Sequence, residues 1–240
     1  MKLVIHYDGT NYHGWASQPD FPTVQGNIEK TIEKLIGHMI KINGSSRTDS
    51  GVHALGQVAN FHIDSPVPTE NFKNALNNLL PDDIVIADVQ EVSQDFDAIS
   101  DTVKKQYDYL IHTGSIRPVL VRNQWHRPGV LDVEAMAVAA GLLVGTHDFK
   151  SFASAADQRD SSVRTITLCT VKQDGDVIKI SVAADGFLYN MVRNIVGTLV
   201  EIGRGRWQPE YIKEILDAND RNAAGPIAPA CGLCLMEIEY

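Results

Sequence analysis

Cysteine is scarce in this sequence, with three among 240 residues, so a disulfide framework is not expected. Two of the three, Cys231 and Cys234, form a Cys-x-x-Cys pair, a spacing found in redox pairs and in halves of zinc sites. No second Cys or His pair lies near enough in sequence to complete a zinc site. Residues 232–240 alternate between apolar and polar side chains, as in a strand. We therefore interpret the two cysteines as small core or edge residues.

Long apolar runs are also missing. No stretch approaches the ~18 apolar residues that a membrane-spanning helix needs. The amino terminus reaches the acidic Asp8 too early for a secretory signal. A composition of 44% hydrophobic and 21% charged residues is typical of a soluble globular protein, and we expect a cytoplasmic one.

Positive charge is in deficit, because 21 Lys and Arg stand against 30 Asp and Glu, for a formal net charge of −9. This excludes a globally basic nucleic-acid-binding protein, since phosphate contacts require Lys and Arg. The deficit is uneven: residues 1–100 hold 6 basic against 13 acidic side chains, and residues 101–240 hold 15 against 17. A basic face on the second half is therefore possible, and we expect Arg204 and Arg206 to belong to it.

The pattern of residues 1–100 predicts an α+β unit. A first strand and a turn-rich loop precede Thr23, a suitable helix N-cap, and apolar residues then recur at helical spacing until Gly37. Two strands surround a polar loop, Thr69 is expected to cap a second helix, and residues 84–89 return as a strand. This β-α-β-β-α-β order is the ferredoxin-like arrangement, with helices on one face of an antiparallel sheet.

Residues 101–240 repeat this outline with variations. A strand at 104–112 places Tyr107 and Tyr109 on one face, because they are two residues apart. The later elements are predicted to be a helix capped by Asp132 and running through 144, a polar loop opened by His147, a hairpin over 165–183, helices at 191–202 and 209–216, and a terminal strand. We expect an α+β fold of two ferredoxin-like, RRM-like halves with antiparallel sheets, helices on their outer faces and an active-site cleft between the halves.

The most distinctive stretch is the polar, glycine-punctuated segment 44–58, which follows one apolar run and leads into another. Arg47 and Asp49 are two residues apart, so in an extended segment their side chains share one face. Loops on a rigid scaffold commonly carry functional side chains. An ordinary hairpin loop with a surface ion pair is the alternative interpretation of this spacing.

Residues 47–54 read Arg-Thr-Asp-x-Gly-Val-His-Ala, which resembles the signature of the tRNA pseudouridine synthase A family. The resemblance identifies Asp49 as the catalytic aspartate. Three further stretches resemble family motifs: the first loop at 8–15, a basic-x-Tyr-x-Tyr strand at 105–109, and a Phe-Leu-x-x-Met-Val-Arg helix start at 187–193. They identify Tyr107 as the active-site tyrosine and Arg193 as the arginine that pairs with the aspartate.

Three positions depart from the family pattern. Ala16 replaces the glutamine that usually follows the tryptophan of the first loop, and Ser46 stands where a glycine more often precedes the signature. Ile99 occupies a position where arginine is expected, so one RNA or structural contact should be weaker. None of the three belongs to the catalytic set.

The resemblance implies isomerisation of uridine within RNA, in which the bond from N1 to C1′ breaks and C5 bonds to C1′. Asp49 would act as a nucleophile or would initiate loss of the base by abstracting a proton. Arg193 would favour the ionised carboxylate. Tyr107 would stack on the base and could accept or relay the C5 proton.

Other residues are expected to bind the substrate. Arg47 would fill the gap left by the extruded base or contact a phosphate, and Phe187 and Leu188 would form an apolar wall for the uracil. His53 follows the signature loop directly, and we interpret it as a structural residue. His147 and the adjacent aspartate lack a third ligand at suitable spacing, so no metal site is predicted.

The implied reaction involves neither redox change nor hydrolysis, so no cofactor or metal is expected. The sequence also contains no P-loop or dinucleotide-binding fingerprint. The family implies a homodimer that binds one tRNA across both subunits. Its targets are uridines at positions 38, 39 and/or 40, on the 3′ side of the anticodon stem-loop, and such breadth suggests recognition of tRNA shape and backbone.

Two other classes of function remain open at this point. A non-enzymatic RNA-binding module could use the same ferredoxin-like sheet, but the sequence lacks the aromatic strand motif of such modules. A metal-dependent hydrolase would need clustered His and carboxylate ligands, which the sequence does not suggest. An assay of tRNA uridines in the presence of a chelator distinguishes the three.

Overall fold

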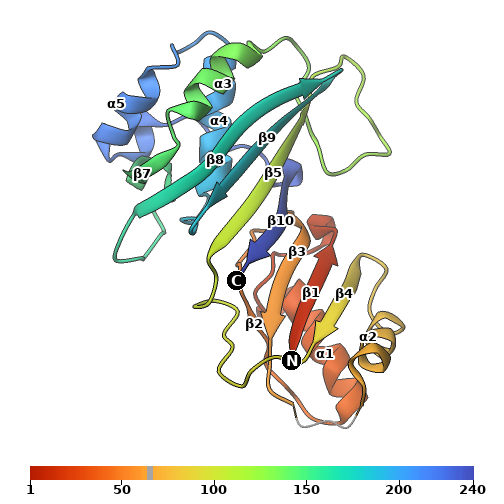
Figure 1. Cartoon of the computed structure of the whole chain (residues 1–240). Coiled ribbons are helices and arrows are strands. Elements are labelled where there is room, and N and C mark those ends of the chain that lie inside the picture. Colours follow the sequence, from red (N-terminus) through yellow and green to blue (C-terminus); the bar gives the residue numbers. More distant parts are fainter. Residues whose placement is uncertain (64–66) are drawn as a thin grey trace. The chain divides into compact units, whose positions relative to one another are not determined.

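The computed structural model describes residues 1–63 and 67–240, which form two compact units (Figure 1). The first unit comprises Met1–Val103 together with Cys234–Tyr240, and the second comprises Lys104–Leu233. The chain therefore returns to the first unit with its last strand, β10 (Leu233–Glu239), which pairs with a strand there. The sequence pattern predicts a second half that runs from residue 101 to residue 240 and so includes this strand. Alternation of apolar and polar residues predicts that a strand forms, but it does not predict which strand it pairs with.

The first unit contains a mostly antiparallel sheet in the order β4-β1-β3-β10. Strand β1 (Lys2–Tyr7) lies between β3 (His53–Asn60) and β4 (Ile84–Gln90) and is antiparallel to both. The short β2 (Asn43–Gly44) pairs antiparallel with β3, and β10 joins β3 in parallel. The element order β1-α1-β2-β3-α2-β4 agrees with the order predicted from sequence.

Helix α1 (Val24–Ile36) has the predicted ends. The Thr23 side chain accepts a hydrogen bond from the backbone N–H of Gly26, which satisfies one of the unpaired donors of the first turn. At the other end Gly37 takes a left-handed conformation with φ of 84°, as is common at helix C-termini.

Helix α2 (Thr69–Asn77) corrects the predicted cap by one residue. Its N-cap is Pro68, which makes no side-chain cap bond, and Thr69 is the first helical residue. Proline has a fixed φ, here −55°, and extended backbone, so it can precede a helix without a hydroxyl cap. The helix is tied to the edge strand instead, since the Asn77 side chain exchanges two hydrogen bonds with the backbone of Ile86.

The second unit contains the antiparallel order β5-β9-β8-β7. Its strands are β5 (Lys104–His112), β9 (Val177–Ala184), β8 (Val163–Asp174) and β7 (Gly145–Asp148), with the short β6 (Trp125–His126) parallel to β5. The prediction that a loop opens at His147 was wrong. Residues of β7 pair with β8, and Thr146 and Thr165 also share a side-chain hydrogen bond of 2.9 Å across this pair.

Three α-helices of the second unit lie on one side of its sheet (Figure 1). They are α3 (Val133–Gly141), α4 (Met191–Gly203) and α5 (Tyr211–Ala218). Asp132 caps α3 as predicted, by accepting from the Ala135 N–H, but the helix ends three residues before 144. The 3-10 helices are η1 (Gly9–Asn11), η2 (Lys150–Phe152), η3 (Arg221–Ala223) and η4 (Ala230–Gly232).

Among the described residues, no helix combines the length and apolar character that a membrane span requires.

Helix α4 is the centre of the second unit, because every one of its residues except Arg193 is buried. Its polar side chains are satisfied internally: Asn194 donates to the Phe152 carbonyl at 2.7 Å, and Thr198 donates to the Asn194 carbonyl at 2.8 Å. Segment 224–228 crosses the helix so closely that a Cβ added at Gly197 would overlap the Pro226 carbonyl oxygen.

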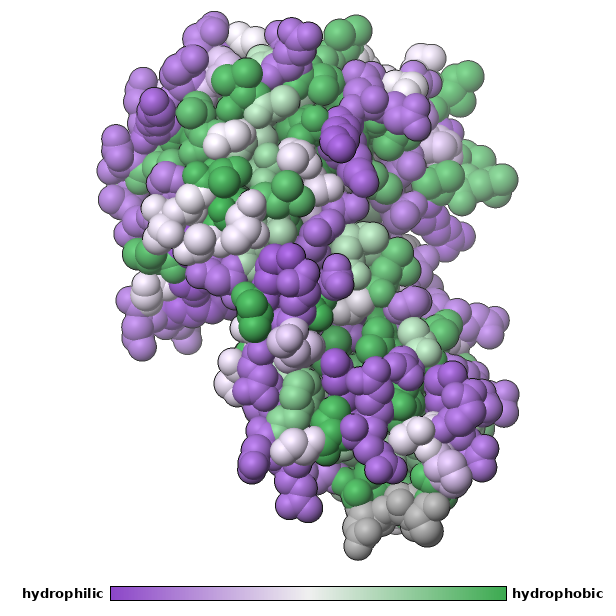
Figure 2. Space-filling view, in the orientation of Figure 1, coloured by the Kyte–Doolittle hydropathy of each residue, from purple (hydrophilic) through white to green (hydrophobic). Residues whose placement is uncertain are grey.

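The surface mixes polar and apolar side chains (Figure 2). The most exposed large apolar residues lie on either side of β6, at Ile116, Val119, Leu120 and Val130, each at least 80% exposed. Isolated apolar side chains on a surface are ordinary, but a local concentration of them favours contact with another macromolecule.

The crossing at Gly197 generates a stability prediction. We expect Gly197→Ala to lower the free energy of unfolding by about 1–3 kcal/mol, because the added methyl group must displace backbone in a packed region. Urea denaturation of wild type and variant measures this difference.

Gly141→Ala is the matched control. It also changes a helical glycine, but nothing lies within 4 Å of the added Cβ, so the change should be neutral or stabilising by up to about 1 kcal/mol. Equal free energies of unfolding for the two variants would contradict the close crossing.

Candidate active site

Exposure alternates along the signature loop of the first unit. Arg47 is exposed and Asp49 is partly buried, while Thr48 between them is buried. This alternation is what an extended segment produces. The sequence prediction that the two side chains share a face therefore agrees with the burial pattern.

Buried polar contacts hold the backbone of this loop. Gln57 on β3 accepts from the Ser46 N–H at 3.1 Å and donates to the Ser46 carbonyl at 2.6 Å. The Thr48 hydroxyl hydrogen-bonds the Tyr7 hydroxyl at 2.7 Å, and the Thr48 carbonyl accepts from the Trp15 N–H at 3.0 Å. Because buried polar groups are costly when unpaired, these contacts favour one conformation of the loop.

The first loop, residues 8–15, packs directly against the signature loop. Gly14 has φ of 89°, and a Cβ there would lie 2.6 Å from the Thr48 carbonyl oxygen. His53 is buried, accepts from the Gly9 N–H at 3.2 Å and lies 3.1 Å from the Asp8 carboxylate. Its interpretation as a structural residue agrees with these contacts.

In the second unit, Tyr107 and Phe187 meet. Tyr107 is buried on β5, and its ring lies edge-to-face with the Phe187 ring at a centroid distance of 5.2 Å. Leu188 is buried beside it in sequence. The structure therefore brings together the predicted tyrosine and the first residue of the predicted apolar wall.

Arg193 lies in the first turn of α4 and is partly buried. Its Nε donates to the Ala228 carbonyl at 2.8 Å, and one terminal nitrogen donates to Asn190 Oδ1 at 3.2 Å. Asn190 has φ of 63°, a left-handed conformation that asparagine tolerates better than most residues. These two oxygen atoms therefore hold the guanidinium group in one orientation.

Arg204 and Arg206 lie together beyond the end of α4. They donate to opposite oxygens of the Glu201 carboxylate, at 3.0 and 3.1 Å. Glu201 is only 3% exposed, so it requires such partners, whereas both arginines are exposed. Their charges have a structural task that the sequence did not reveal.

Two of the departures from the family pattern differ in exposure. Ser46 is buried and bonded to Gln57 through its backbone, whereas Ile99 is 56% exposed.

Within the described residues, no three His, Cys, Asp or Glu side chains are arranged to hold a metal ion. Cys231 lies in η4 and Cys234 in β10, so the two thiols belong to different units.

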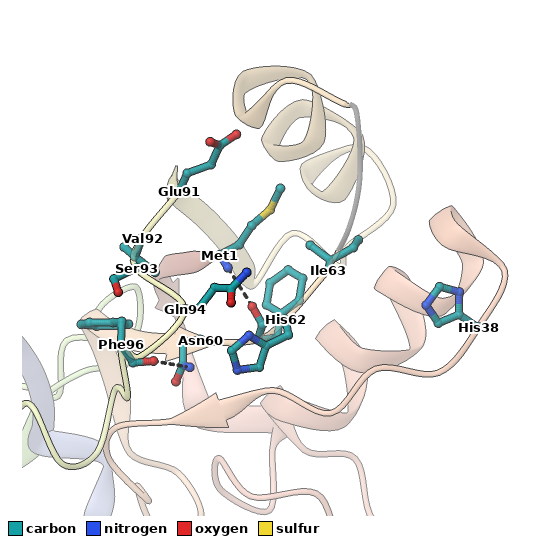
Figure 3. A pocket seen from close by; sticks show the side chains of 11 residues that line it. Met1, His38, Asn60, His62, Ile63, Glu91, Val92, Ser93, Gln94 and Phe96 are labelled. Atoms are coloured by element: carbon teal, nitrogen blue, oxygen red, sulfur yellow. Dashed lines mark hydrogen bonds between the residues drawn. The ribbon is translucent and has the colours of Figure 1, made fainter.

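A separate pocket of about 700 Å³ opens in the first unit (Figure 3). It is lined by polar groups including His38, His62 and Glu91, and by Met1, whose ammonium group donates to the Phe61 carbonyl at 2.7 Å. None of the predicted site residues lines it. This pocket is therefore not the basis for the candidate site.

Sequence reasoning missed three charged residues near Tyr107 and Phe187. Lys105 lies two residues before Tyr107 on β5, and Asp157 and Arg159 hold the backbone of Phe187 and its neighbours from a polar loop. The loop composition gave no signal, because polar loop residues are usually solvated. The sequence signal that could have identified one of them is the basic residue of the basic-x-Tyr-x-Tyr motif, which is Lys105.

These groups can bind an aromatic ring against Tyr107 and Phe187 and can bind anions through several cations. A partly buried carboxylate, Asp49, is available for nucleophilic or basic chemistry. Asp49 belongs to the first unit, whereas Tyr107 and Arg193 belong to the second. Their approach to one another stays a prediction.

Comparison with known proteins matches this chain to one family. The sequence model of a family described as tRNA pseudouridine synthase matches residues 3–99 and 139–240. Relatives named tRNA pseudouridine synthase A in Acetivibrio thermocellus and Clostridium kluyveri are 48% and 46% identical, and one named tRNA pseudouridine synthase A 2 in Clostridium perfringens is 50% identical. Each alignment covers 100% of this chain and 99% of the relative.

A solved structure titled "Crystal Structure of a Cbf5-Nop10-Gar1 Complex" matches over 99% of this chain and 58% of its own, with a TM-score of 0.37 and 11% identity. That likeness is too weak to support an argument about fold or partners.

Lys105 generates a prediction about protonation. Burial, followed by the charge of Arg159, lowers the pKa of Lys105 from 10.5 to about 8. Because this folded-state pKa is the lower one, the charged form costs stability below pH 8, and the cost disappears as the pH rises from 8 to 10.5. We expect the Lys105 side-chain NMR signal, assigned with Lys105→Arg, to titrate near pH 8 in the folded protein and near 10.5 in denaturant. A midpoint near 10.5 in both states would contradict the burial of this amine.

Proposed function

Because this chain belongs to the tRNA pseudouridine synthase family, an isomerase family acting on tRNA uridine, we propose that it modifies positions 38, 39 and/or 40 of the anticodon stem-loop. The family and the reaction type follow from the full-length match to named relatives. The choice of positions is supported by the resemblance of the signature loop around Asp49 to that of the A-type enzymes. This loop is the single observation on which the proposed mechanism depends.

The reaction rearranges one nucleotide without an external reactant. The bond between N1 and C1′ breaks, the uracil turns, C5 bonds to C1′, the C5 proton leaves and N1 gains a proton. The target base must first leave its stack, at a cost of a few kcal/mol. We assign Arg47 to the space that the base vacates, because its side chain is exposed on a loop whose backbone is held by Gln57 and Tyr7.

Asp49 is assigned as the residue that starts the reaction. A carboxylate can attack the ring or the sugar, or can abstract a proton to release the base, and each route needs the ionised form. Thr48 is buried and bonded on both its hydroxyl and its carbonyl, which supports a fixed position for the neighbouring carboxylate. A fixed reactive group lowers the entropic part of the barrier.

Arg193 is assigned as the electrostatic partner of Asp49. Its Nε and one terminal nitrogen bind Ala228 and Asn190, so the orientation of the planar guanidinium is set before substrate arrives. A preorganised cation of this kind stabilises an ionised carboxylate without further reorganisation. Pairing of the two side chains is part of this proposal.

Tyr107, Phe187 and Leu188 are assigned to the uracil. The edge-to-face contact between Tyr107 and Phe187 leaves aromatic surface of the kind on which bases stack. Tyr107 also has a hydroxyl that can accept or relay the C5 proton late in the reaction.

Arg204 and Arg206 are assigned to the tRNA backbone. Their side chains are exposed although each contacts Glu201, and guanidinium groups have further donors for phosphate. Burial, then the charge of nearby Arg204, lowers the pKa of Arg127, which indicates that a third arginine adds to the same positive field.

The finer architecture and the assembly are also proposals. We infer two ferredoxin-like halves with an active-site cleft between them, a homodimer that binds one tRNA, and a cytoplasmic location where tRNA is processed. The exposed apolar side chains on either side of β6 support contact with a second copy. No cofactor or metal has a role in the proposed steps.

A single assay tests the function against the alternative of a non-enzymatic RNA-binding module. Purified protein is incubated with unmodified tRNA and a chelator, and pseudouridine is mapped by nucleotide. Pseudouridine at 38, 39 or 40 supports the proposal. Binding without isomerisation would favour the binding module, and product at other positions would overturn the assigned target.

The role of Asp49 predicts a separation of binding from catalysis. Asp49→Asn preserves size but removes charge and nucleophilicity, so we expect tRNA binding within about tenfold of wild type, ~1.4 kcal/mol, and no detectable pseudouridine. Filter binding and product mapping on the same tRNA measure both. Asp49→Glu should also be nearly inactive, because a shift of about 1 Å in a reactive group can cost ~100-fold.

The role would be refuted by substantial isomerisation in Asp49→Asn. Loss of fold and binding together would instead make Asp49 a structural residue. Circular dichroism of each variant distinguishes the two results.

The role of Arg193 predicts that charge alone does not suffice. Arg193→Lys keeps the positive charge but loses the planar fork that binds several oxygens at once. We expect kcat to fall by at least about tenfold, corresponding to loss of one charge-assisted hydrogen bond of ~1.5 kcal/mol or more. Near-normal turnover in a folded Arg193→Lys protein would contradict a close pair with Asp49.

A further inference from the structure

A polar segment of the second unit, residues 154–159, binds the backbone of residues 187–189, and we name it the strap. The Ser154 N–H donates to the Tyr189 carbonyl at 2.9 Å, and the Tyr189 N–H donates to Asp157 at 2.6 Å. Arg159 donates to the Phe187 carbonyl at 2.8 Å. Three hydrogen bonds therefore connect the strap to the segment that contacts Tyr107.

Asp157 is the anchor of the strap. Its side chain is only 6% exposed, yet it accepts from the backbone N–H groups of Tyr189 and Arg159 and from the Arg159 guanidinium. These donors, with the charges of Arg159 and Arg164, outweigh the opposing effect of burial, and the pKa of Asp157 is lowered. The carboxylate thus stays ionised and holds Arg159 in place.

Arg159 retains unused binding capacity. Its side chain is 49% exposed, and one terminal nitrogen, Nη1, makes both the ion pair at 3.0 Å and the bond to Phe187. Within the described part of the chain, its Nε and Nη2 have no hydrogen-bond acceptor. A guanidinium has five N–H donors, so most of them remain available to an anion.

Lys105 adds a second cation to this region. It lies two residues before Tyr107, hence on the same face of β5. Burial first, and then the charge of Arg159, lowers the pKa of Lys105, so the two cations repel each other. Clustered cations beside an aromatic site are arranged to bind a phosphate group, since an anion relieves their repulsion.

We propose that Arg159, anchored by Asp157, binds a backbone phosphate beside the target uridine and at the same time positions the Phe187 wall against Tyr107. This rests on the proposed function, because it assumes that the uracil occupies the Tyr107 site. Arg159 is a substrate-binding residue in this arrangement, and Asp157 is a positioning residue that acts through it. Phosphate binding and placement of the aromatic wall are thereby coupled in one side chain.

The test measures tRNA affinity at several salt concentrations, with kcat and KM for pseudouridine formation. Arg159→Gln should weaken binding roughly tenfold and reduce the slope of log affinity against log salt by about 0.7–0.9, the value of one phosphate contact. Arg159→Lys should keep the wild-type slope but lower kcat, because an ammonium lacks the planar fork that binds Asp157, Phe187 and a phosphate together. Asp157→Asn should lower kcat with little change in slope.

Lys213→Gln is the matched control, since it removes one charge from an exposed position of the same unit, on α5. It should change neither the slope nor kcat. Methylphosphonate substitution of each phosphate within two nucleotides of the target uridine tests the RNA side independently. One substitution should weaken wild-type binding, and Arg159→Gln should be insensitive to that same substitution.

A wild-type salt slope in folded Arg159→Gln, or no methylphosphonate position that weakens wild-type binding, would overturn the proposal. The methylphosphonate series uses wild-type protein, so an insensitive series overturns the proposal even where Arg159→Gln fails to fold, and Arg159→Lys then tests the role of the side chain. Absence of pseudouridine with wild-type protein would refute the proposed function instead, and a reduced slope in Arg159→Gln would still identify an RNA phosphate contact.

Discussion

Burial of α4 is the constraint on which the second unit depends. A helix enclosed on nearly all sides must be apolar and must satisfy its few polar groups internally, and Asn194 and Thr198 do so. Segment 224–228 can cross it only because Gly197 has no side chain. The same crossing brings the Ala228 carbonyl to Arg193, so the packing of this helix sets the orientation of its one partly exposed cation.

The two units use one physical device to order their polar loops. In the first unit the buried Gln57 amide satisfies both backbone groups of Ser46. In the second, the buried Asp157 carboxylate satisfies two backbone N–H groups. A buried polar side chain loses much stability if its partners move, so each loop is held in one conformation. The exposed arginines Arg47 and Arg159 are then presented by ordered backbone.

Several charges of this acidic protein have both a structural and a proposed substrate-binding task. Arg204 and Arg206 neutralise the buried Glu201, and Arg159 neutralises Asp157. An arginine can do both because its planar fork offers more donors than one carboxylate uses. Substitution of such residues is therefore expected to affect both folding and the proposed RNA binding, so charge-preserving variants are the more informative ones.

The sequence alone determined the family resemblance, the order of elements in the first unit and the caps at Thr23 and Asp132, because these depend on local residue types and periodicity. It also assigned Asp49, Tyr107 and Arg193 by motif. Tertiary structure alone decided that β10 returns to the first unit, that β7 pairs with β8, and that Asp157 and Arg159 hold the Phe187 segment. Strand pairing and the hydrogen bonds from Asp157 and Arg159 to residues 187–189 join residues far apart in sequence, so local residue types and periodicity do not predict them.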